Sequence, residues 1–595
     1  MTRNEAPVTT NYYALSNAAN QAQSETIGSA LRRLVPLMAD ERRSVGVAFV
    51  AIIITSGSSL LAPLIIGHTV DTYIQARDFP GVLKMSAVLL GVYVIGLFTT
   101  YLQTITMGTV GRRVLFNLRN ALFTKLQQLP VDFFNQNKAG DLISRINNDT
   151  DKLNQFFAQA LVQLAGNLFL MAGAALFLLA LNIRLGLAAL TPALGVLVLT
   201  QLISAWVKRK NAKSLQSLGG MSAEIQESLS NFKVIVAFNR LDYFRRKFNQ
   251  ANERNFGASV AAGLANNIFI PIYGLSFNLA QLVVLSYGIY LIGAGTMTIG
   301  LLIGFLLYVN SFYMPLRQLA AVWSSFQLAL AALDRISAVL ALESNMPVVP
   351  APAGRSGPVL EFDHVHFSYP GGAEVVRDST FALERGRTYA LIGPTGGGKT
   401  TTASLMARLY DPTGGRVLLD GKDIRSYQPE ERTNRIGFIL QEPFLFTGTI
   451  RDNVLYGNGR YQGHTNDQIV GLLTGRNLDG LLSRFEQGLD TPVAAVGDTV
   501  SLGQKQLIAF MRAVLRDPEI LVLDEATANI DTVTEQLLEQ ILARLPPSTT
   551  KVIIAHRLNT IANADEIFFI NAGAITPAGS MEHALDMLLH DRRES

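Results

Sequence analysis

Two patterns of hydrophobic positions divide this chain near residue 350. Before that point the apolar residues form long, nearly uninterrupted stretches, whereas after it they form short runs. Crossing a bilayer takes about 20 apolar residues in a helix. Six stretches of the first part reach that length, near 45–66, 83–106, 158–181, 185–207, 267–292 and 298–322. The pattern therefore predicts six transmembrane helices.

The segments between these stretches differ in length and charge. Those at 67–82, 182–184 and 293–297 are short, with Arg77 and Arg184 as their basic residues. Segments 107–157 and 208–266 are long and rich in Lys and Arg. Basic residues that flank spans stay on the cytoplasmic side. We therefore expect a multi-pass protein of the cytoplasmic (inner) membrane, with both termini inside.

The two long segments have helical periodicity, so we expect the transmembrane helices to continue into the cytoplasm. Short connectors are expected at the tips, at 130–142 and 227–238. Upstream, residues 1–26 have the composition of a disordered cytosolic tail. Residues 27–38 resemble an amphipathic helix at the membrane surface and begin a membrane domain, 27–345.

A Pro- and Gly-rich linker, 346–358, precedes a second domain at 359–595. Here short β-branched runs such as RTYALIG, ILVLD and KVIIAH alternate with helical stretches. That alternation predicts an α/β domain with a mainly parallel sheet. The predicted fold class is thus a polytopic α-helical membrane domain fused to an α/β domain.

Composition agrees with a membrane protein, since 49% of the residues are hydrophobic and 16% are charged. The chain has no cysteine, which excludes disulfides, Cys-ligated zinc and thiol catalysis. Its net charge is +4, but the basic residues form no stripe, so no nucleic-acid partner is expected.

One glycine-rich loop carries the main candidate chemistry. The run from Gly393 to Thr400, GPTGGGKT, has four residues between a Gly and a Gly-Lys-Thr. Such a loop turns backbone N–H groups toward phosphates, Lys399 reaches the outer phosphates, and the Thr400 hydroxyl can ligate Mg²⁺. A simple Gly-rich turn is the alternative, but the flanking strand and helix favour nucleoside triphosphate binding.

A second element completes this chemistry. The apolar run Ile520–Leu523 ends in two acids, Asp524 and Glu525. A carboxylate at the first position can hold Mg²⁺, and one at the second can polarise an attacking water. Phosphoryl transfer needs mainly such positioning and charge stabilisation.

Together these motifs resemble the ATP-binding cassette (ABC) transporters, and nearly the whole chain, from about 27 to 590, is similar to an exporter half-transporter. The resemblance implies catalytic roles for Glu525, the switch histidine His556 and Gln441, and a D-loop at Asp531. It implies Mg²⁺ ligation by Thr400, Gln441 and Asp524. The implied ATP-binding residues are Tyr369, Gly393, Pro394, Thr395, Gly396, Gly397, Gly398, Lys399, Thr400, Thr401 and Asp524.

The signature that would contact ATP held by the opposite subunit departs from the family pattern. It is Ser501-Leu502-Gly503-Gln504, with a leucine where the common form has glycine. A leucine side chain there could hinder approach of backbone to phosphate. An intact Glu525 with this signature resembles one half of heterodimeric bacterial multidrug exporters. A symmetric homodimer is the alternative.

The expected function is ATP-driven export of small amphipathic or lipophilic compounds by alternating access, as one half of a dimer in the lipid bilayer. A homodimeric flippase for lipids and an ATP-gated regulatory membrane protein are the alternatives. Polar residues in or beside the last two spans either line a cavity or bond helices together. Aromatic residues there suit lipophilic cargo or simple packing; they are Phe269, Tyr273, Phe277, Phe305, Tyr308, Phe312 and Tyr313.

Overall fold

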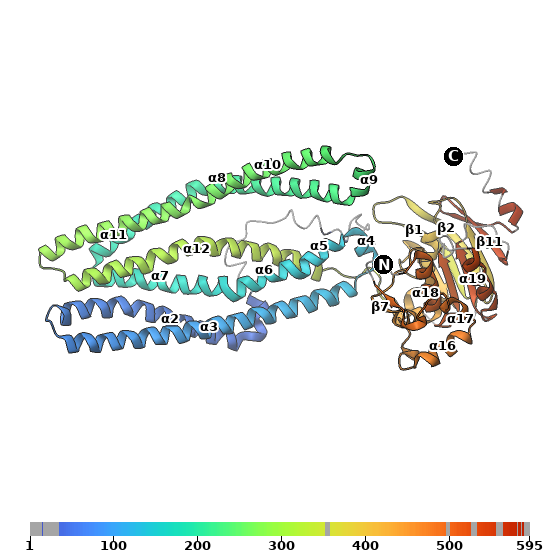
Figure 1. Ribbon diagram of the computed structural model, residues 1–595, viewed down its shortest axis with the longest axis horizontal. Coiled ribbons are helices and arrows are strands. Elements are labelled where there is room, and N and C mark those ends of the chain that lie inside the picture. Colours follow the sequence, from blue (N-terminus) through green and yellow to red (C-terminus); the bar gives the residue numbers. More distant parts are fainter. Residues whose placement is uncertain are drawn as a thin grey trace, which may run out of the picture. The chain divides into compact units, whose positions relative to one another are not determined.

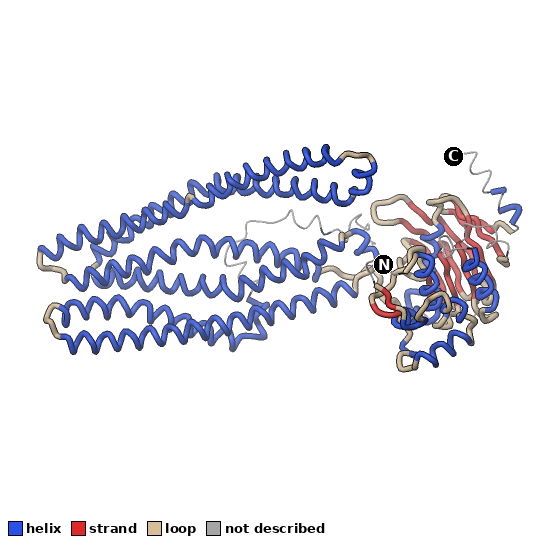
Figure 2. The backbone as a smooth tube through the Cα atoms, in the orientation of Figure 1, coloured by secondary structure: helices blue, strands red, loops and turns tan. Residues whose placement is uncertain are grey.

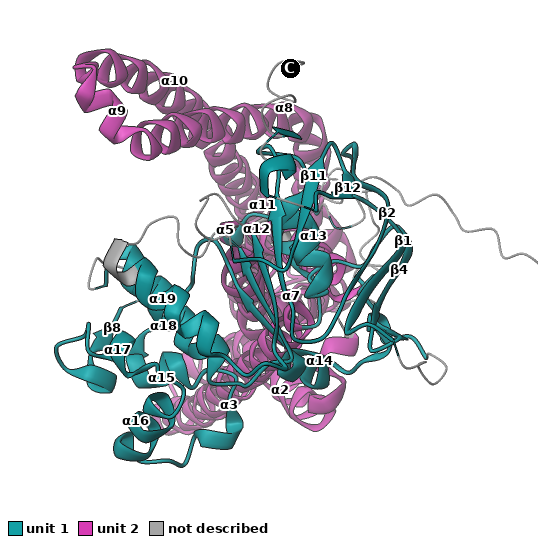
Figure 3. Cartoon of the chain, turned by 90° about the vertical axis from the view of Figure 1, so that its right-hand side faces the viewer, with its two compact units in different colours: residues 1–15, 128–139, 342–595 teal, residues 16–127, 140–341 magenta. Residues whose placement is uncertain are grey.

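The computed structural model describes residues 13, 15, 35–350, 357–494, 500–524, 532–554, 563–579, 581–584 and 586–587. Its contacts divide the chain into two compact units, which Figure 3 shows in two colours. Unit 1 comprises residues 1–15, 128–139 and 342–595, and unit 2 comprises 16–127 and 140–341. The predicted connector at 130–142 therefore falls mostly in the unit that contains the α/β domain.

Unit 2 is helical throughout its described part. Long helices run side by side in pairs, α2 with α3, α7 with α12 and α8 with α10 (Figure 1). Its elements are η2 (Val35–Glu41), α2 (Arg42–Thr69), η3 (Val70–Ile74), α3 (Phe79–Gln127), α5 (Ala139–Ser144), η4 (Arg145–Asp149), α6 (Thr150–Gln155), η5 (Phe156–Ala160), α7 (Leu161–Leu181), α8 (Ile183–Ser230), α9 (Phe232–Ala237), α10 (Leu241–Asn267), α11 (Phe269–Gly293) and α12 (Ile299–Leu340).

The six predicted spans are confirmed. In the described part of the chain, six helical stretches are long and apolar enough to cross a membrane, and each matches one predicted span to within one residue or contains it: Pro36–Ile74, Phe79–Gln127, Ala139–Leu181, Ile183–Ser230, Leu241–Gly293 and Ile299–Leu340.

The predicted extensions also exist, because α3 has 49 residues and α8 has 48. At about 1.5 Å per residue, each is roughly 70 Å long, well beyond a hydrocarbon core of about 30 Å. A short helix lies in each predicted connector, α4 (Val131–Gln136) in unit 1 and α9 in unit 2.

The N-terminal segment contains a feature that composition did not indicate. Within residues 1–26, predicted as a tail, the structure describes Tyr13 and Leu15, and both are buried. Of the predicted amphipathic helix at 27–38, residues 27–34 lie outside the described residues, and 35–38 belong to η2. The prediction for the rest of the tail stays a prediction.

Unit 1 contains two main sheets, drawn as red strands in Figure 2. An antiparallel sheet has the order β2-β1-β4-β5, and a six-stranded sheet has the order β12-β11-β3-β10-β9-β6. The second sheet is parallel except for β12. The strands are β1 (Leu360–Ser368), β2 (Glu374–Leu383), β3 (Thr388–Ile392), β4 (Gly414–Leu419), β5 (Lys422–Asp423), β6 (Ile436–Ile439), β7 (Gly448–Thr449), β8 (Pro492–Val493), β9 (Ile520–Asp524), β10 (Thr550–Ile554), β11 (Glu566–Asn571) and β12 (Ala574–Pro577).

Helices flank these strands and complete the unit. The α-helices are α4, α13 (Lys399–Met406), α14 (Pro429–Arg435), α15 (Ile450–Val454), α16 (Asn466–Thr474), α17 (Asp479–Leu482), α18 (Leu502–Val514) and α19 (Thr532–Arg544). Short 3-10 turns are η6 (Ile424–Ser426), η7 (Gly459–Tyr461) and η8 (Gly488–Asp490).

The parallel sheet determines where the site forms. All five residues of β9 are buried, as expected of a central strand covered on both faces. Because β3, β10, β9 and β6 are parallel, their carboxyl ends lie along one edge. The phosphate loop follows β3, Asp524 ends β9, and Gln441 follows β6. The sheet therefore gathers three predicted site segments at one edge.

Candidate functional site: the nucleotide-binding edge of the sheet

The glycine-rich loop joins β3 to α13 with a backbone that needs glycine. Gly393, Gly396 and Gly398 have φ angles of 143°, 82° and 112°, which side chains disfavour. Space is equally restrictive, since a Cβ on Gly393 would lie 2.0 Å from the Ile570 carbonyl oxygen. Conformation thus favours glycine at all three positions, and packing adds to this at Gly393 and Gly398, where a Cβ would meet a backbone oxygen, but not at Gly396.

Lys399, the first residue of α13, is held at this loop. Its residue is 6% exposed, and its Nζ donates to the carbonyls of Gly393 and Pro394 at 2.9 Å each. The ammonium and the amino end of α13 therefore occupy the same small region. Both favour an anion, by charge and by helix dipole. This is the arrangement that a phosphate-binding loop requires.

The candidate magnesium ligands come together across a strand. The Thr400 hydroxyl donates to Asp524 Oδ1 at 3.2 Å. In the sheet, Ile554 of β10 pairs with Leu391 of β3 on one side and with Asp524 of β9 on the other, so β10 separates the strand before the loop from the strand that ends in Asp524. A hydroxyl and a buried carboxylate are hard oxygen ligands, which suit Mg²⁺ completed by phosphate and water. The residues present therefore fit this ion, which would neutralise phosphate charge.

Gln441 is exposed just beyond β6, the strand next to β9. Its position at the carboxyl edge agrees with the predicted role beside Mg²⁺. That role remains a prediction, because ligation by its amide oxygen needs the ion itself.

Tyr369, the predicted adenine-stacking residue, belongs to an aromatic cluster. Its ring meets Tyr410 edge-on at 5.4 Å and Phe367 edge-on at 4.9 Å. Its hydroxyl lies 3.1 Å from Thr401 Oγ1, so this side chain is tied to the first turn of α13. The arrangement places an aromatic ring near the phosphate loop, and base stacking remains a prediction.

Sequence reasoning missed Tyr410. Its hydroxyl accepts a hydrogen bond from Asn135 Nδ2 of α4 at 2.6 Å, and burial raises the pKa of Tyr410 above its ordinary value. The connector helix thus touches the aromatic cluster beside the nucleotide site. Position 410 shows no motif in the sequence, so only the folded chain identifies it.

The signature residues form the start of α18. Ser501 is the N-cap, accepting from Gln504 N–H, while its own N–H donates to Gln504 Oε1 at 2.9 Å. This capping box stabilises the helix start. Neither Leu502 nor Gly503 has a positive φ, and Leu502 is 42% exposed. The leucine therefore causes no backbone strain, and its side chain is free to meet a partner.

Three predicted residues cannot be placed in this geometry. Glu525, Asp531 and His556 lie outside the described residues. The strands before two of them do end at the site edge, because Asp524 closes β9 and Ile554 closes β10. Their roles remain predictions.

Comparison with known proteins agrees with this geometry. Residues 45–316 match the family described as ABC transporter transmembrane region, and residues 376–528 match the family described as ABC transporter. The chain is 31% identical to the uncharacterized ABC transporter ATP-binding protein YfiC of Bacillus subtilis, over 96% of this chain and 94% of that protein.

Two further relatives carry more specific names. A multidrug resistance ABC transporter ATP-binding and permease protein of Lactococcus lactis is 31% identical over 83% of each chain. A fatty acid ABC transporter ATP-binding/permease protein of Mycobacterium bovis is 31% identical over 88% of this chain and 82% of that protein. The chain therefore belongs to the ABC transporter family, as an exporter-type half-transporter whose ATPase domain couples ATP hydrolysis to transport.

Proposed function

We propose that this chain is one half of a heterodimeric exporter that moves small amphipathic or lipophilic compounds out of the cell. The observation that carries the proposal is polar surface on the membrane helices. Asn278, Asn310 and Gln318 lie in or beside predicted spans of α11 and α12, and all three are exposed in the single chain. Polar groups facing lipid are costly, so a second half-transporter enclosing a polar-lined pathway explains them.

The aromatic residues of the same helices serve a different purpose. Tyr308 and Tyr313 are buried, and their hydroxyls donate to the carbonyls of Leu60 at 2.7 Å and Ala189 at 2.8 Å. Tyr273 and Phe305 are buried as well. These four aromatic residues therefore pack the helices together. In the proposal, cargo is recognised by the exposed polar residues instead.

The tip of the α8–α10 hairpin also supports a dimer. There α9 and the residue after it expose Phe232, Val234, Val236 and Phe238 by 54%, 55%, 49% and 74%. Exposed apolar clusters of this kind mark interaction sites. In the proposed cycle, ATP held between Lys399 of one subunit and the signature of the other favours closed ATPase domains. Closure acts on the membrane helices through α4 and α9 because binding differs between the two states.

The names of the relatives are consistent with this cargo class, since drugs and fatty acids are both lipophilic or amphipathic. Because one relative is named a fatty acid transporter, lipid export by a homodimer is the second candidate function. Uptake into inverted vesicles separates them: a lipophilic cationic dye should accumulate with ATP, while a fluorescent phospholipid analogue should not. Accumulation of the phospholipid analogue alone would favour the second candidate.

Native mass spectrometry tests the partner. The tagged chain, extracted from its own host, should carry a non-identical polypeptide of similar mass in a one-to-one ratio. Leu502→Gly adds a functional test, since hydrolysis at the ATP site facing α18 should rise severalfold if the leucine hinders it. Two copies of this chain alone would overturn the heterodimer, whatever the effect of Leu502→Gly, because α18 faces an ATP site in either kind of dimer.

A further inference from the structure

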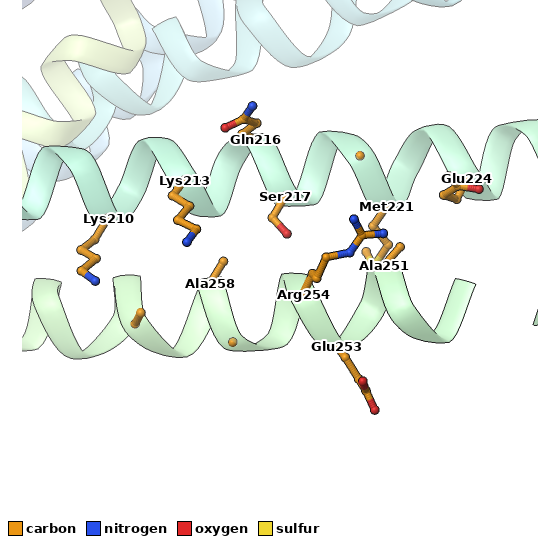
Figure 4. Close-up of a pocket in the computed structure, with 13 residues that line it drawn as sticks. Lys210, Lys213, Gln216, Ser217, Met221, Glu224, Ala251, Glu253, Arg254 and Ala258 are labelled. Atoms are coloured by element: carbon orange, nitrogen blue, oxygen red, sulfur yellow. The ribbon is translucent and has the colours of Figure 1, made fainter. Parts of the chain in front are cut away.

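A cavity of about 630 Å³ lies between α8 and α10, outside the nucleotide site (Figure 4). Lys210, Lys213 and Ser217 line it from α8, and Arg254, Gly257 and Ala258 line it from α10. We name this cavity the hairpin groove. No role for it follows from the ATPase chemistry or from the proposed cargo.

A polar contact between α8 and α10 lies near each end of the hairpin groove. At the membrane end the amides of Asn211 and Asn266 bond each other at 2.9 and 3.0 Å. At the other end, Lys247 pairs with Glu224 at 2.9 Å and Glu227 at 3.1 Å. Between these contacts, small residues such as Gly257 leave open space, since a Cβ there would meet nothing within 4 Å. The groove is therefore a formed cavity between two fixed contacts.

The charges of the groove are unbalanced. In the described part of the chain, Lys210, Lys213 and Arg254 form no ion pair with an acid. Of the two acids that line the groove, Glu224 is paired with Lys247, and Glu253 points away (Figure 4). An anionic ligand would neutralise this cationic surface.

The depth of the lysines indicates the source of the anion. Lys210 and Lys213 lie three and six residues beyond the apolar stretch 185–207, or about 5 and 9 Å along a helix. Headgroups occupy about 5–8 Å on each side of the hydrocarbon core. The backbone of Lys210 therefore falls in the headgroup layer of the cytoplasmic leaflet, and that of Lys213 lies just beyond it, within reach of its long side chain.

The same face of α8 continues into the membrane as an apolar stripe. Leu199, Leu202 and Trp206, spaced three and four residues apart, precede Lys210 on this face and are 45%, 72% and 38% exposed. An apolar stripe that ends in two cations matches an acyl chain joined to a phosphate. A soluble phosphate would need only the cations.

We propose that the hairpin groove binds the phosphate of an anionic phospholipid from the cytoplasmic leaflet. Lys210 and Lys213 hold the phosphate, the Ser217 hydroxyl is within the same groove, and an acyl chain lies along Leu202 and Trp206. Arg254 extends the cationic surface toward the tip. The lipid is a resident partner of the hairpin, so the inference stands whichever cargo is exported.

The test compares two double variants of the complete transporter in nanodiscs of phosphatidylcholine with phosphatidylglycerol. K210Q/K213Q removes two charges from the groove. K208Q/R209Q removes two charges at the same depth from residues that do not line it, and is the matched control. Lipid retained on the protein is counted by native mass spectrometry. K210R/K213R, which keeps the charge, verifies that the fold tolerates substitution.

K210Q/K213Q removes two charge-assisted contacts to the phosphate, whereas K208Q/R209Q removes only surface charge outside the groove, which salt screens. K210Q/K213Q should therefore retain phosphatidylglycerol about tenfold more weakly than the control, and K210R/K213R should bind as wild type. If K208Q/R209Q lost as much phosphatidylglycerol as K210Q/K213Q, the lipid would be held by general surface charge, and the proposal would be overturned. Displacement of the lipid by millimolar inorganic phosphate would overturn the lipid source, because the site would then take soluble phosphate.

Discussion

Asp71, in the first turn of η3, caps the first turn of α12, where its Oδ1 accepts a hydrogen bond from the Gly300 N–H at 2.7 Å. Beside this contact the backbones of α2 and α12 approach each other directly. A Cβ on Gly300 of α12 would lie 2.1 Å from the carbonyl oxygen of Gly67 of α2. A carboxylate at a helix N-terminus is stabilised by the helix dipole. This contact therefore holds the outer ends of α2 and α12 together.

Asp71→Ala should release that contact, because it removes both the cap and the charge, at a cost of about 1 kcal/mol. Spin labels at position 68 and at the exposed position 299 would measure the distance between the outer ends and leave the Thr298 cap of α12 intact. We expect a broader distribution shifted to longer distances, with Asp71→Asn intermediate. An unchanged distribution in Asp71→Ala would show that the helices are held by other contacts.

Substitution of Lys399 separates binding from chemistry. Lys399→Ala should weaken ATP binding about tenfold or more, because the cation at the phosphate loop is lost, whereas Lys422→Ala, at an exposed lysine, should not.

Glu525→Gln should leave ATP binding intact and lower hydrolysis by about 100-fold. Fluorescent-nucleotide titration and phosphate release measure the two effects. Normal turnover in Glu525→Gln would contradict its assigned role.

Tyr13 should stabilise the connector and the linker. Its hydroxyl donates to the Glu343 carbonyl at 3.0 Å and accepts from Asn345 N–H at 2.7 Å, while its ring meets Phe133 of α4 edge-on at 6.0 Å. Tyr13→Ala should expose the amides of 131–137 and 343–345 to hydrogen exchange in the full chain, because it removes both packing and hydrogen bonds.

Two further variants separate the contacts that join the N-terminal segment around Tyr13 to the connector. Tyr13→Phe keeps the ring contact and should lose part of the protection, about 1 kcal/mol. Asn137→Ala removes the amide that bonds the Tyr13 carbonyl at 2.8 Å and the Leu15 N–H at 3.2 Å. Exchange equal to wild type in both Tyr13→Ala and Asn137→Ala would mean that the N-terminal segment does not fix the connector.

Glu519 gives the ATPase domain a specific pH dependence. Hydrogen bonding from Arg435 lowers the pKa of Glu519 below its ordinary value of 4.5, against the opposing effect of burial, and Arg385 adds to the lowering. The folded state thus prefers the ionised carboxylate. Its contribution is complete above about pH 4.5 and is lost as the pH falls from there through the lower folded pKa.

Glu519→Gln should therefore lower the melting temperature of the full transporter at pH 7. A third of this side chain is exposed, so solvent screening limits the effect to about 1 kcal/mol, or roughly 2–4 °C. The difference from wild type should shrink as the pH falls below 4.5. Glu486→Gln, at an exposed acid, is the control. A difference that grows in acid would show that the folded state does not prefer the ionised form of Glu519.

Much of this molecule follows from local patterns. Membrane helices must satisfy their backbone within one segment, so apolar length alone located all six spans. The phosphate loop is equally local, because its glycines and Lys399 act within eight consecutive residues. The capping box of Ser501 and Gln504 was not predicted and became apparent only in the structure.

The sequence by itself thus determined the six spans, the α/β domain and the phosphate loop, since each depends on periodicity or spacing within a short segment. Only the tertiary structure decided which distant residues meet. Asp71 reaching Gly300, Asn135 reaching Tyr410 and the burial of Tyr13 all join segments far apart in the chain. Such contacts arise from the way helices and strands pack, and no local pattern encodes them.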